Sequence, residues 1–407
     1  MSDQAVKTEA PIFNPASPEF VRDPYPAYHQ LRNLAPIFKT PVGFWLATRF
    51  DDVNAILRDK RFGKDFEDRT KAQLGEDIFE IPVYNSMRNW MLVRNPPDHT
   101  RLRGLVARIF TPKRITALKP RIEQLVDELL DDVEAKGEMN VIRDFAYPLP
   151  VNVICDMLGV PTEDRGQFYT SSEKSGRLID PTPLTDEELE QANSGHLQLA
   201  GYFQGLINKR RAEPKDDLLS VLAQANEDGE ILSDDELIAN TILLFGAGHE
   251  TTVNLIGNGL LALLSNPAQF EALKADPSLI NGAVEEMLRY DSSVQLTSRT
   301  ALEDAEINGA VIAKGETVIT LLGAANRDPE QFDRPDEFDV TRKAVRPTSF
   351  GGGIHHCLGA PLARMEGQVA FTKLLERFPN MRLKNQDHAN FKPTYTLRGL
   401  IDLPIEF

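Results

Sequence analysis

The stretch SFGGGIHHCLGAPLAR, residues 349 to 364, contains one of only two cysteines in a chain of 407 residues. A proline such as Pro361 suits the first turn of a helix, so a helix is expected to begin just after Cys357. Its free N–H groups and positive dipole end would then point at the sulfur. A thiolate requires such positive potential, and glycines allow a backbone to approach a flat ligand closely. The local pattern therefore favours one thiolate held under a planar cofactor.

Two other interpretations of this loop are weaker. One is a glycine turn that contains a cysteine incidentally. The other is a zinc site made by His355, His356 and Cys357, but adjacent side chains do not easily converge on one tetrahedral ion. The second cysteine, Cys155, lies in the apolar run VNVICDMLGV and reads as a small buried hydrophobe.

Composition predicts an ordinary globular protein, with 41% hydrophobic residues and no low-complexity tract or repeat. We expect a single domain over residues 1–407, in which residues 1–20 form a flexible N-terminal segment. No stretch predicts a membrane span or a signal peptide, so we expect a cytoplasmic location. The net charge of −16 disfavours a nucleic acid or an anionic membrane as partner.

One basic segment departs from this acidic background. Residues 101–121 contain no acid and predict a site that needs an anionic partner. Its basic residues are Arg101, Arg103, Arg108, Lys113, Arg114, Lys119 and Arg121.

The periodicity of apolar residues predicts a mainly α fold with small antiparallel β-sheets. Residues 120–137 form one amphipathic helix that ends at Gly137. A longer helix starts at a capping box of Ser233 and Glu236 and ends at Asn266-Pro267; it has more than one apolar face and is expected to be central. Strands are expected in FWLATRF near residue 44 and in residues 296–322, with turns at Asn308-Gly309 and Lys314-Gly315.

Three further motifs suggest chemistry. In AGHETT, the Thr251 hydroxyl can bond the carbonyl of Ala247 and open the helix locally, beside the ionisable Glu250. In EEMLRY, Glu286 and Arg289 have ion-pair spacing, which usually marks a solvated surface pair. In HTRLR, two basic side chains lie four residues apart on one helix face. That motif contributes His99 and Arg103, and Arg299 lies in a later strand.

The pattern Phe350-Gly351-x-Gly353-x-His355-x-Cys357-x-Gly359 resembles the haem-binding signature of the cytochrome P-450 superfamily. The resemblance extends from about residue 20 to the C-terminus, and the other motifs follow in the family's order. It implies the P-450 fold, with haem b between the long central helix and the Cys-loop helix. It also implies the following cofactor-binding residues, of which Cys357 is the iron ligand: His99, Arg103, Ala247, Arg299, Phe350, His355, Cys357 and Gly359.

By the same resemblance, Glu250 and Thr251 are the acid–alcohol pair that helps to protonate bound dioxygen. Glu286 and Arg289 correspond to a structural Glu-x-x-Arg element that holds the segment before the Cys loop. Membrane-bound relatives add an arginine to that element from a Pro-Glu-Arg-Phe motif. This chain has Pro335-Asp336-Glu337-Phe338 instead, and Arg342 is a candidate substitute.

The resemblance implies a haem-thiolate monooxygenase that inserts one atom of O₂ into a C–H bond. Its electrons are expected from a separate ferredoxin or flavodoxin with its reductase. One hypothesis is that an acidic partner of this kind docks at the basic segment, on a surface shared with Arg364; the alternative is that the segment partly serves the haem propionates and is otherwise solvated. The substrate is an apolar small molecule of fatty acid, terpenoid, steroid or polyketide type. Residues 62–93 correspond to the family's variable lid. Candidate substrate contacts are Trp90, Leu92, Leu178, Leu243, Leu244, Val294, Leu296 and Tyr395.

Two alternatives remain open from the sequence. One is a peroxide-driven or nitric-oxide-reducing enzyme on the same fold, although peroxygenases of this family commonly lack the acid–alcohol pair. The other is a non-catalytic haem-based sensor, which would not need that pair.

Overall fold

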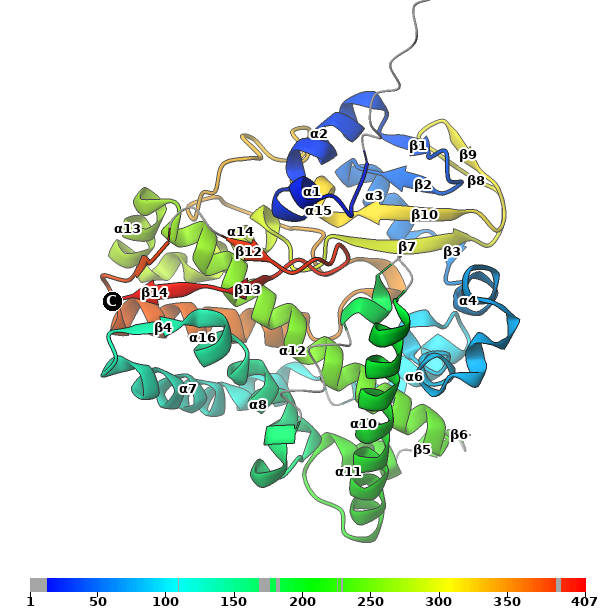
Figure 1. Ribbon diagram of the computed structural model, residues 1–407, viewed down its shortest axis with the longest axis horizontal. Coiled ribbons are helices and arrows are strands. Elements are labelled where there is room, and N and C mark those ends of the chain that lie inside the picture. The colour runs from blue at the N-terminus through cyan, green and yellow to red at the C-terminus, as the bar shows by residue number, and fades with distance from the viewer. Residues whose placement is uncertain are drawn as a thin grey trace, which may run out of the picture.

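The computed structural model describes residues 13–108, 110–167, 176–180, 184–224, 226–227, 230–385 and 389–407 (Figure 1). Its α-helices are α1 (Pro18–Arg22), α2 (Tyr25–Leu34), α3 (Phe50–Arg58), α4 (Phe66–Leu74), α5 (Pro82–Met87), α6 (Asp98–Ala107), α7 (Pro112–Glu134), α8 (Pro148–Leu158), α10 (Asp186–Ala212), α11 (Leu218–Gln224), α12 (Asp234–Leu264), α13 (Pro267–Ala275), α14 (Ile280–Tyr290), α15 (Leu322–Ala325) and α16 (Ala360–Arg377). Its strands are β1 (Ile37–Lys39), β2 (Trp45–Ala47), β3 (Phe62–Gly63), β4 (Glu138–Asn140), β5 (Asn226–Glu227), β6 (Glu230–Ile231), β7 (Leu296–Ala301), β8 (Ala305–Ile307), β9 (Ala310–Ile312), β10 (Thr317–Leu321), β11 (Arg382–Leu383), β12 (Asn390–Phe391), β13 (Leu400–Asp402) and β14 (Pro404–Glu406).

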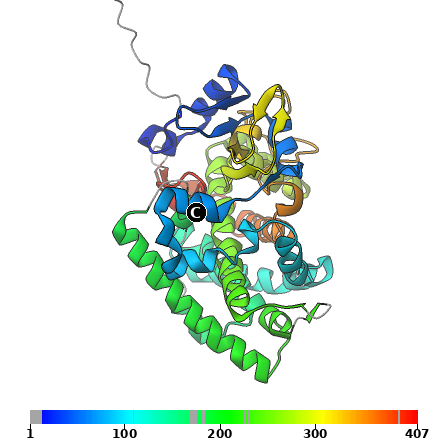
Figure 2. The same ribbon diagram turned by 90° about the vertical axis from the view of Figure 1, so that its right-hand side faces the viewer.

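The long helix α12 is central, as the sequence predicts. Its capping box is present, because Glu236 N–H donates to Ser233 Oγ over 3.1 Å and Ser233 N–H donates to Glu236 Oε2 over 3.0 Å. Twenty of its 31 residues are buried, which places protein around most of its circumference. It crosses the interior in both views, whereas α10 follows the outer edge (Figures 1 and 2).

Helices α7, α8, α14 and α16 pack around the C-terminal half of α12 and share one apolar core with it. A side chain at Gly259 of α12 would come within 2.8 Å of the Phe371 ring of α16, so the two helices approach closely there. Helix α7 is longer than predicted. Thr111 caps it, Pro120 lies inside it, and it ends at Glu134, three residues before Gly137.

The main sheet and the β8–β9 hairpin form one end of the molecule, next to α1, α2, α3 and α15, whereas the remaining short strands lie elsewhere (Figure 1). The main sheet has the order β1-β2-β10-β7-β3. The turn predicted at Asn308-Gly309 joins β8 to β9, with positive φ at both residues. The turn at Gly315 leads into β10, which pairs antiparallel with β7 and parallel with β2. One parallel pair therefore joins strands that are far apart in the chain.

The sequence overestimates two segments near the N-terminus. Strand β2 covers only residues 45–47 of FWLATRF, because Arg49 is already the N-cap of α3. Residues 18–20 of the expected flexible segment 1–20 belong to α1, which begins at Pro18. The buried Phe20 packs on Tyr28 with ring centroids 5.6 Å apart. Residues 1–12 lie outside the described residues. Among the described helices, none combines the length and apolar character needed to cross a membrane.

Candidate active site

The Cys loop lies between α3 and the start of α16. The Cys357 N–H donates to the Phe350 carbonyl over 2.9 Å and closes the loop. Gly353 has a φ of +66°, which favours glycine, and a Cβ there would lie 2.1 Å from the carbonyl oxygen of Leu57 in α3. The sequence assigned the loop glycines to close contact with a flat ligand. At Gly353, however, the space is taken by the backbone of α3.

The surroundings of Cys357 have opposing effects on the pKa of its thiol. Burial raises the pKa of the thiol, while the N–H groups of Gly359 and Ala360 and the charge of Arg103 act to lower it. These N–H groups come from the start of α16, as the sequence predicts. Because the net effect is a raised pKa, the protein by itself favours the neutral thiol, and a bound metal ion would be needed to hold a thiolate.

The Cys loop and the middle of α12 each have an exposed residue. Cys357 retains exposed surface although the protein around it is dense enough to desolvate the thiol. Ala247 is likewise exposed, halfway along the otherwise buried α12. Helices α12 and α16 are in contact further along, at Gly259 and Phe371. We infer that the middle of α12 and the Cys loop face a common space inside the protein.

Two histidines that meet near this space have nitrogens without partners. The rings of His99 on α6 and His355 in the Cys loop are 4.3 Å apart between centroids. The Nε2 atom of each is buried and makes no hydrogen bond within the described structure. Burial, with nearby cations, lowers the pKa of His99 to about 4 and of His355 to about 2. Both imidazoles are therefore neutral, and the Nε2 atom of each is available for a hydrogen bond to a bound group.

Buried cations surround the same place. Burial lowers the pKa of Arg299 to about 10 and holds the pKa of Lys64 well below its usual range. The Lys64 ammonium donates to the Ser298 carbonyl over 2.9 Å, and the Arg69 guanidinium donates to the Ser298 hydroxyl over 3.0 Å. These cations line a cavity of about 40 Å³ together with Asp65. Buried positive charge of this kind requires anions.

The residues present therefore fit a haem. Its two carboxylates would offset the charge of Arg299 and its neighbours and would accept hydrogen bonds from the unpartnered histidines. Its iron would supply the positive charge that stabilises the thiolate form of Cys357. The sequence predicted Arg299, His99 and His355 for this role but missed Lys64 and Arg69. In RFGKDFEDRT both look like ordinary surface charges, and only the fold brings them to Ser298, next to Arg299.

The acid–alcohol motif has the predicted local geometry. Thr251 Oγ1 donates to the Ala247 carbonyl over 3.1 Å. His249, two residues before Thr251, is buried, and burial lowers its pKa to about 4, so it is neutral. Glu250 forms an ion pair with Lys392 over 3.4 Å. The sequence contains no local signal for Lys392, which follows Glu250 by 142 residues.

The candidate substrate contacts are distributed over several apolar clusters. Trp90, Leu243 and Leu244 are buried in one apolar cluster, against which Leu178 packs. Leu296 and Tyr395 belong to a second cluster, and Val294 packs against a third. Leu92 lies outside these clusters and is 39% exposed.

The Glu-x-x-Arg pair is not the solvated pair that its spacing usually indicates. Glu286 and Arg289 are both fully buried, and two nitrogens of Arg289 donate to the carboxylate over 2.7 Å each. Arg289 also donates to the carbonyls of Asn326, Pro335 and Glu337, which lie in the segment before the Cys loop. Arg342 completes the pair at 3.2 Å from Glu286, as proposed from the sequence.

Four of the seven basic residues of segment 101–121 have acidic partners within the described structure. Arg101 pairs with Glu236 of α12, and Arg121 pairs with Asp156 of α8 over 3.0 Å. Two weaker pairs at 3.7 Å join Arg114 to Asp216 and Lys119 to Glu123. Arg103 donates to the His356 carbonyl in the Cys loop over 2.5 Å. The charge left for an external partner is smaller than the sequence suggests.

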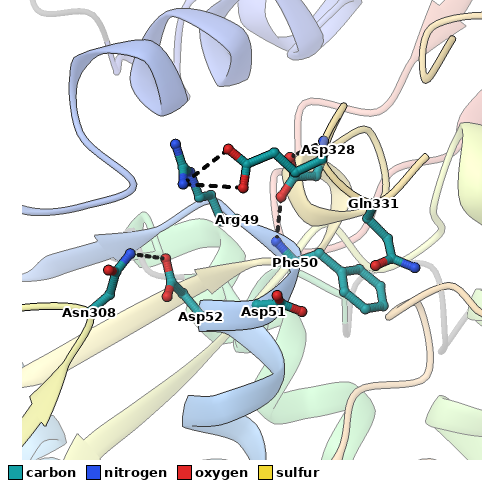
Figure 3. Close-up of a pocket in the computed structure, with 8 residues that line it drawn as sticks. Arg49, Phe50, Asp51, Asp52, Asn308, Asp328 and Gln331 are labelled. Carbon is teal, nitrogen blue, oxygen red and sulfur yellow. Dashed lines mark hydrogen bonds and ion pairs between the residues drawn. The ribbon is translucent and has the colours of Figure 1, made fainter. Parts of the chain in front are cut away.

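A hollow of about 290 Å³ lies at the start of α3 (Figure 3). Its polar groups pair with one another: Phe50 N–H donates to Asp328 over 2.8 Å, and Asn308 donates to Asp52 over 3.2 Å. It shares no residue with the Cys loop or with α12. These contacts cap α3 and join it to the neighbouring segments.

One buried carboxyl on α16 makes stability depend on pH. Glu366 is 1% exposed, its Oε2 has no hydrogen-bond partner, and burial raises its pKa to about 8. The folded state therefore keeps a proton that the unfolded chain loses above a pH of about 4.3, and this loss favours unfolding up to pH 8. We expect Glu366→Gln to raise the melting temperature relative to wild type by more at pH 8 than at pH 5. The exposed Glu376→Gln is the control on the same helix. An equal difference at both pH values would contradict this prediction.

Comparison with known proteins agrees with this geometry. A family model described as Cytochrome P450 matches residues 48–401. The chain is 43% identical to the vitamin D(3) 25-hydroxylase of Pseudonocardia autotrophica, over 95% of this chain and 94% of that protein. It is 41% identical to the biotin biosynthesis cytochrome P450 of Bacillus subtilis, over 96% of this chain and 98% of that protein.

A solved structure is also similar over nearly its whole length. It is P450BioI in complex with an acyl carrier protein ligated to hexadec-9Z-enoic acid. The similarity has a TM-score of 0.90 and 41% identity, and it covers 97% of this chain and 100% of that chain.

Proposed function

This chain belongs to the cytochrome P450 family, an oxidoreductase family of haem-thiolate monooxygenases, and from this premise we propose that it hydroxylates an apolar small molecule at a site built around Cys357. The observation that supports the proposal is the exposed Cys357 at the start of α16, next to a pair of buried histidines, His99 and His355, whose Nε2 atoms have no hydrogen-bond partner. With only two cysteines, far apart in the chain, we propose that the cofactor is the non-covalent haem b.

The proposed haem-binding residues have distinct roles. Cys357 would hold the iron, and the N–H groups of Gly359 and Ala360 would stabilise the negative charge on its sulfur. His99, His355 and Arg299 would hold the two carboxylates, and Arg103 links α6 to the Cys loop through the His356 carbonyl. We assign Phe350 to the same site, where its ring packs against the Arg364 guanidinium at 4.4 Å. When bound, the haem supplies a thiolate-ligated iron that activates O₂.

The chain's own contribution to the chemistry is proton movement along α12. Glu250 holds a carboxylate whose side chain is 12% exposed, so it can exchange protons with water. The Thr251 hydroxyl, which now donates to Ala247, lies on the next residue and can pass a proton into the space beside Ala247. Such positioned acid–base groups typically contribute 10²- to 10⁴-fold in rate.

We expect Thr251→Ala to uncouple the reaction. Without the hydroxyl, product formed per reductant consumed is expected to fall about tenfold or more, while reductant consumption continues and hydrogen peroxide appears. Thr251→Ser keeps a hydroxyl and is the control. The measurement is the ratio of product and peroxide to reductant. Equal ratios in the Ala, Ser and wild-type proteins would contradict the proposed role.

For the substrate we propose a long aliphatic or fused-ring molecule. Two relatives support it: one is named a vitamin D(3) 25-hydroxylase, and the solved structure contains a carrier-bound fatty-acyl chain. Trp90, Leu243 and Leu244 give an apolar environment suited to either.

The experiment is turnover of a hexadecenoyl chain, free and carrier-bound, and of vitamin D₃, with ¹⁸O₂. We propose a separate ferredoxin or flavodoxin with its reductase as the electron source. Incorporation of one ¹⁸O atom that depends on the redox partner supports the proposal. Turnover driven by peroxide alone would replace it with the peroxygenase alternative.

A further inference from the structure

The ion pair between Glu250 and Lys392 joins the proposed proton donor to a distant loop. Lys392 begins the loop between β12 and β13, and its ammonium lies 3.4 Å from Glu250 Oε1. The two side chains are only 22% and 12% exposed. An ion pair with this little exposure is screened less than a surface pair, so loss of one partner has a larger effect.

The position of the Lys392 backbone does not depend on its side chain. Its N–H donates to the Gly399 carbonyl over 2.9 Å, and its carbonyl accepts from Thr394 N–H over 2.8 Å. Gly399 lies in close contact with α12, since a Cβ at this position would be only 1.8 Å from Asn254 Oδ1. Asn254 is three residues beyond Thr251. The loop is therefore seated on α12 beside the acid–alcohol pair.

The far side of the same loop is anchored as well. Thr396 N–H donates to Asp180 over 2.9 Å, and the Thr396 carbonyl accepts from Gln295 N–H over 2.9 Å. Leu397 pairs with Val294 as an isolated bridge. With anchors on α12, on residue 180 and on residues 294–295, the loop is expected to keep its place when the Lys392 side chain is changed.

The residue next to the pair contributes no competing charge. His249 is neutral at pH 7, and its ring lies against Phe245 and Tyr147 with centroids 5.1 and 5.8 Å away. Its Nδ1 is 2.7 Å from the Phe245 carbonyl, which fixes the ring within α12. Lys392 thus supplies positive charge to Glu250 from outside the helix.

We propose that Lys392 is a positioning residue for Glu250, which holds the carboxylate in its orientation next to Thr251. This inference rests on the proposed role of Glu250 as proton donor. Without the ammonium, the half-buried carboxylate loses this contact and the orientation that it fixes, and proton delivery slows. Arginine at position 392 retains the charge and the reach, whereas methionine retains only the apolar stem.

The test compares Lys392→Met, Lys392→Arg, Glu250→Gln and the Met–Gln double variant as holoenzymes. We expect Lys392→Met to lower product per reductant about tenfold and to enlarge the solvent isotope effect on turnover, with the substrate dissociation constant unchanged. Lys392→Arg should restore most of the yield. The double variant should match Glu250→Gln alone, because coupled residues are not additive. The control is Lys384→Met, which removes a lysine from an exposed ion pair with Glu138.

A readout independent of activity is thermal unfolding of the same four proteins. If the pair is coupled in the fold, the melting-temperature change of the double variant should differ from the sum of the changes of the two single variants. If Glu250→Gln lowers the product formed per reductant but Lys392→Met does not, the inference about Lys392 is overturned and the role of Glu250 stands. Glu250→Gln indistinguishable from wild type would overturn the proposed proton donor, and the inference with it.

Discussion

Cys357→Ser is expected to abolish the red-shifted carbon monoxide band of the reduced protein, which is the signature of thiolate-ligated haem. A serine hydroxyl ionises far less readily than a thiol, and its oxygen lacks the soft, electron-donating character of sulfur. The N–H groups of Gly359 and Ala360 do not compensate, because even for the thiol the effect of burial exceeds theirs. The measurement is the difference spectrum of the reduced protein with and without carbon monoxide.

Cys155 provides the matched control for this experiment. It is fully buried in α8, and burial raises its pKa to about 12, so it is an inert thiol. Cys155→Ala should keep the band. Since the chain has two cysteines in all, a band that survives in Cys357→Ser but disappears in Cys155→Ala would move the iron site to α8 and contradict the assignment.

Arg289→Met is expected to destabilise the protein by about 3–5 kcal/mol, the typical cost of breaking a buried ion pair. The substitution leaves the buried Glu286 carboxylate with Arg342 as its remaining ion-pair partner and deprives three carbonyls of a donor. Those carbonyls lie in the segment before the Cys loop, so haem content should fall as well. Urea unfolding followed by circular dichroism measures the change in free energy.

The comparison variant for this prediction is Arg334→Met. Arg334 forms an ion pair with Glu337 over 2.6 Å, but both side chains are more than half exposed. Exposed pairs typically contribute 0.2–1 kcal/mol, so this variant should unfold at nearly the wild-type urea concentration. If the two variants were equally stable, the buried network would not hold the segment before the Cys loop.

The sequence by itself determined the features that depend on neighbours in the chain. The capping box at Ser233, the turn at Asn308-Gly309 and the helix start after Cys357 are set by backbone geometry and hydrogen bonds within a few residues. The hydrogen bond from Thr251 to Ala247 follows in the same way from helical spacing. The order of these motifs also indicated the family, which the comparisons confirmed.

Only the tertiary structure decided which charges are buried and what they meet. Arg289 and Glu286 have the spacing of a surface pair but are fully enclosed, and Lys64 looks like a surface charge in the sequence but is desolvated next to Arg299. The basic segment 101–121 meets acids from α8 and α12 that no local pattern indicates. Lys392 reaches Glu250 across 142 residues. Desolvation and Coulomb energy depend on position in space, and chain spacing beyond a few residues does not encode that position.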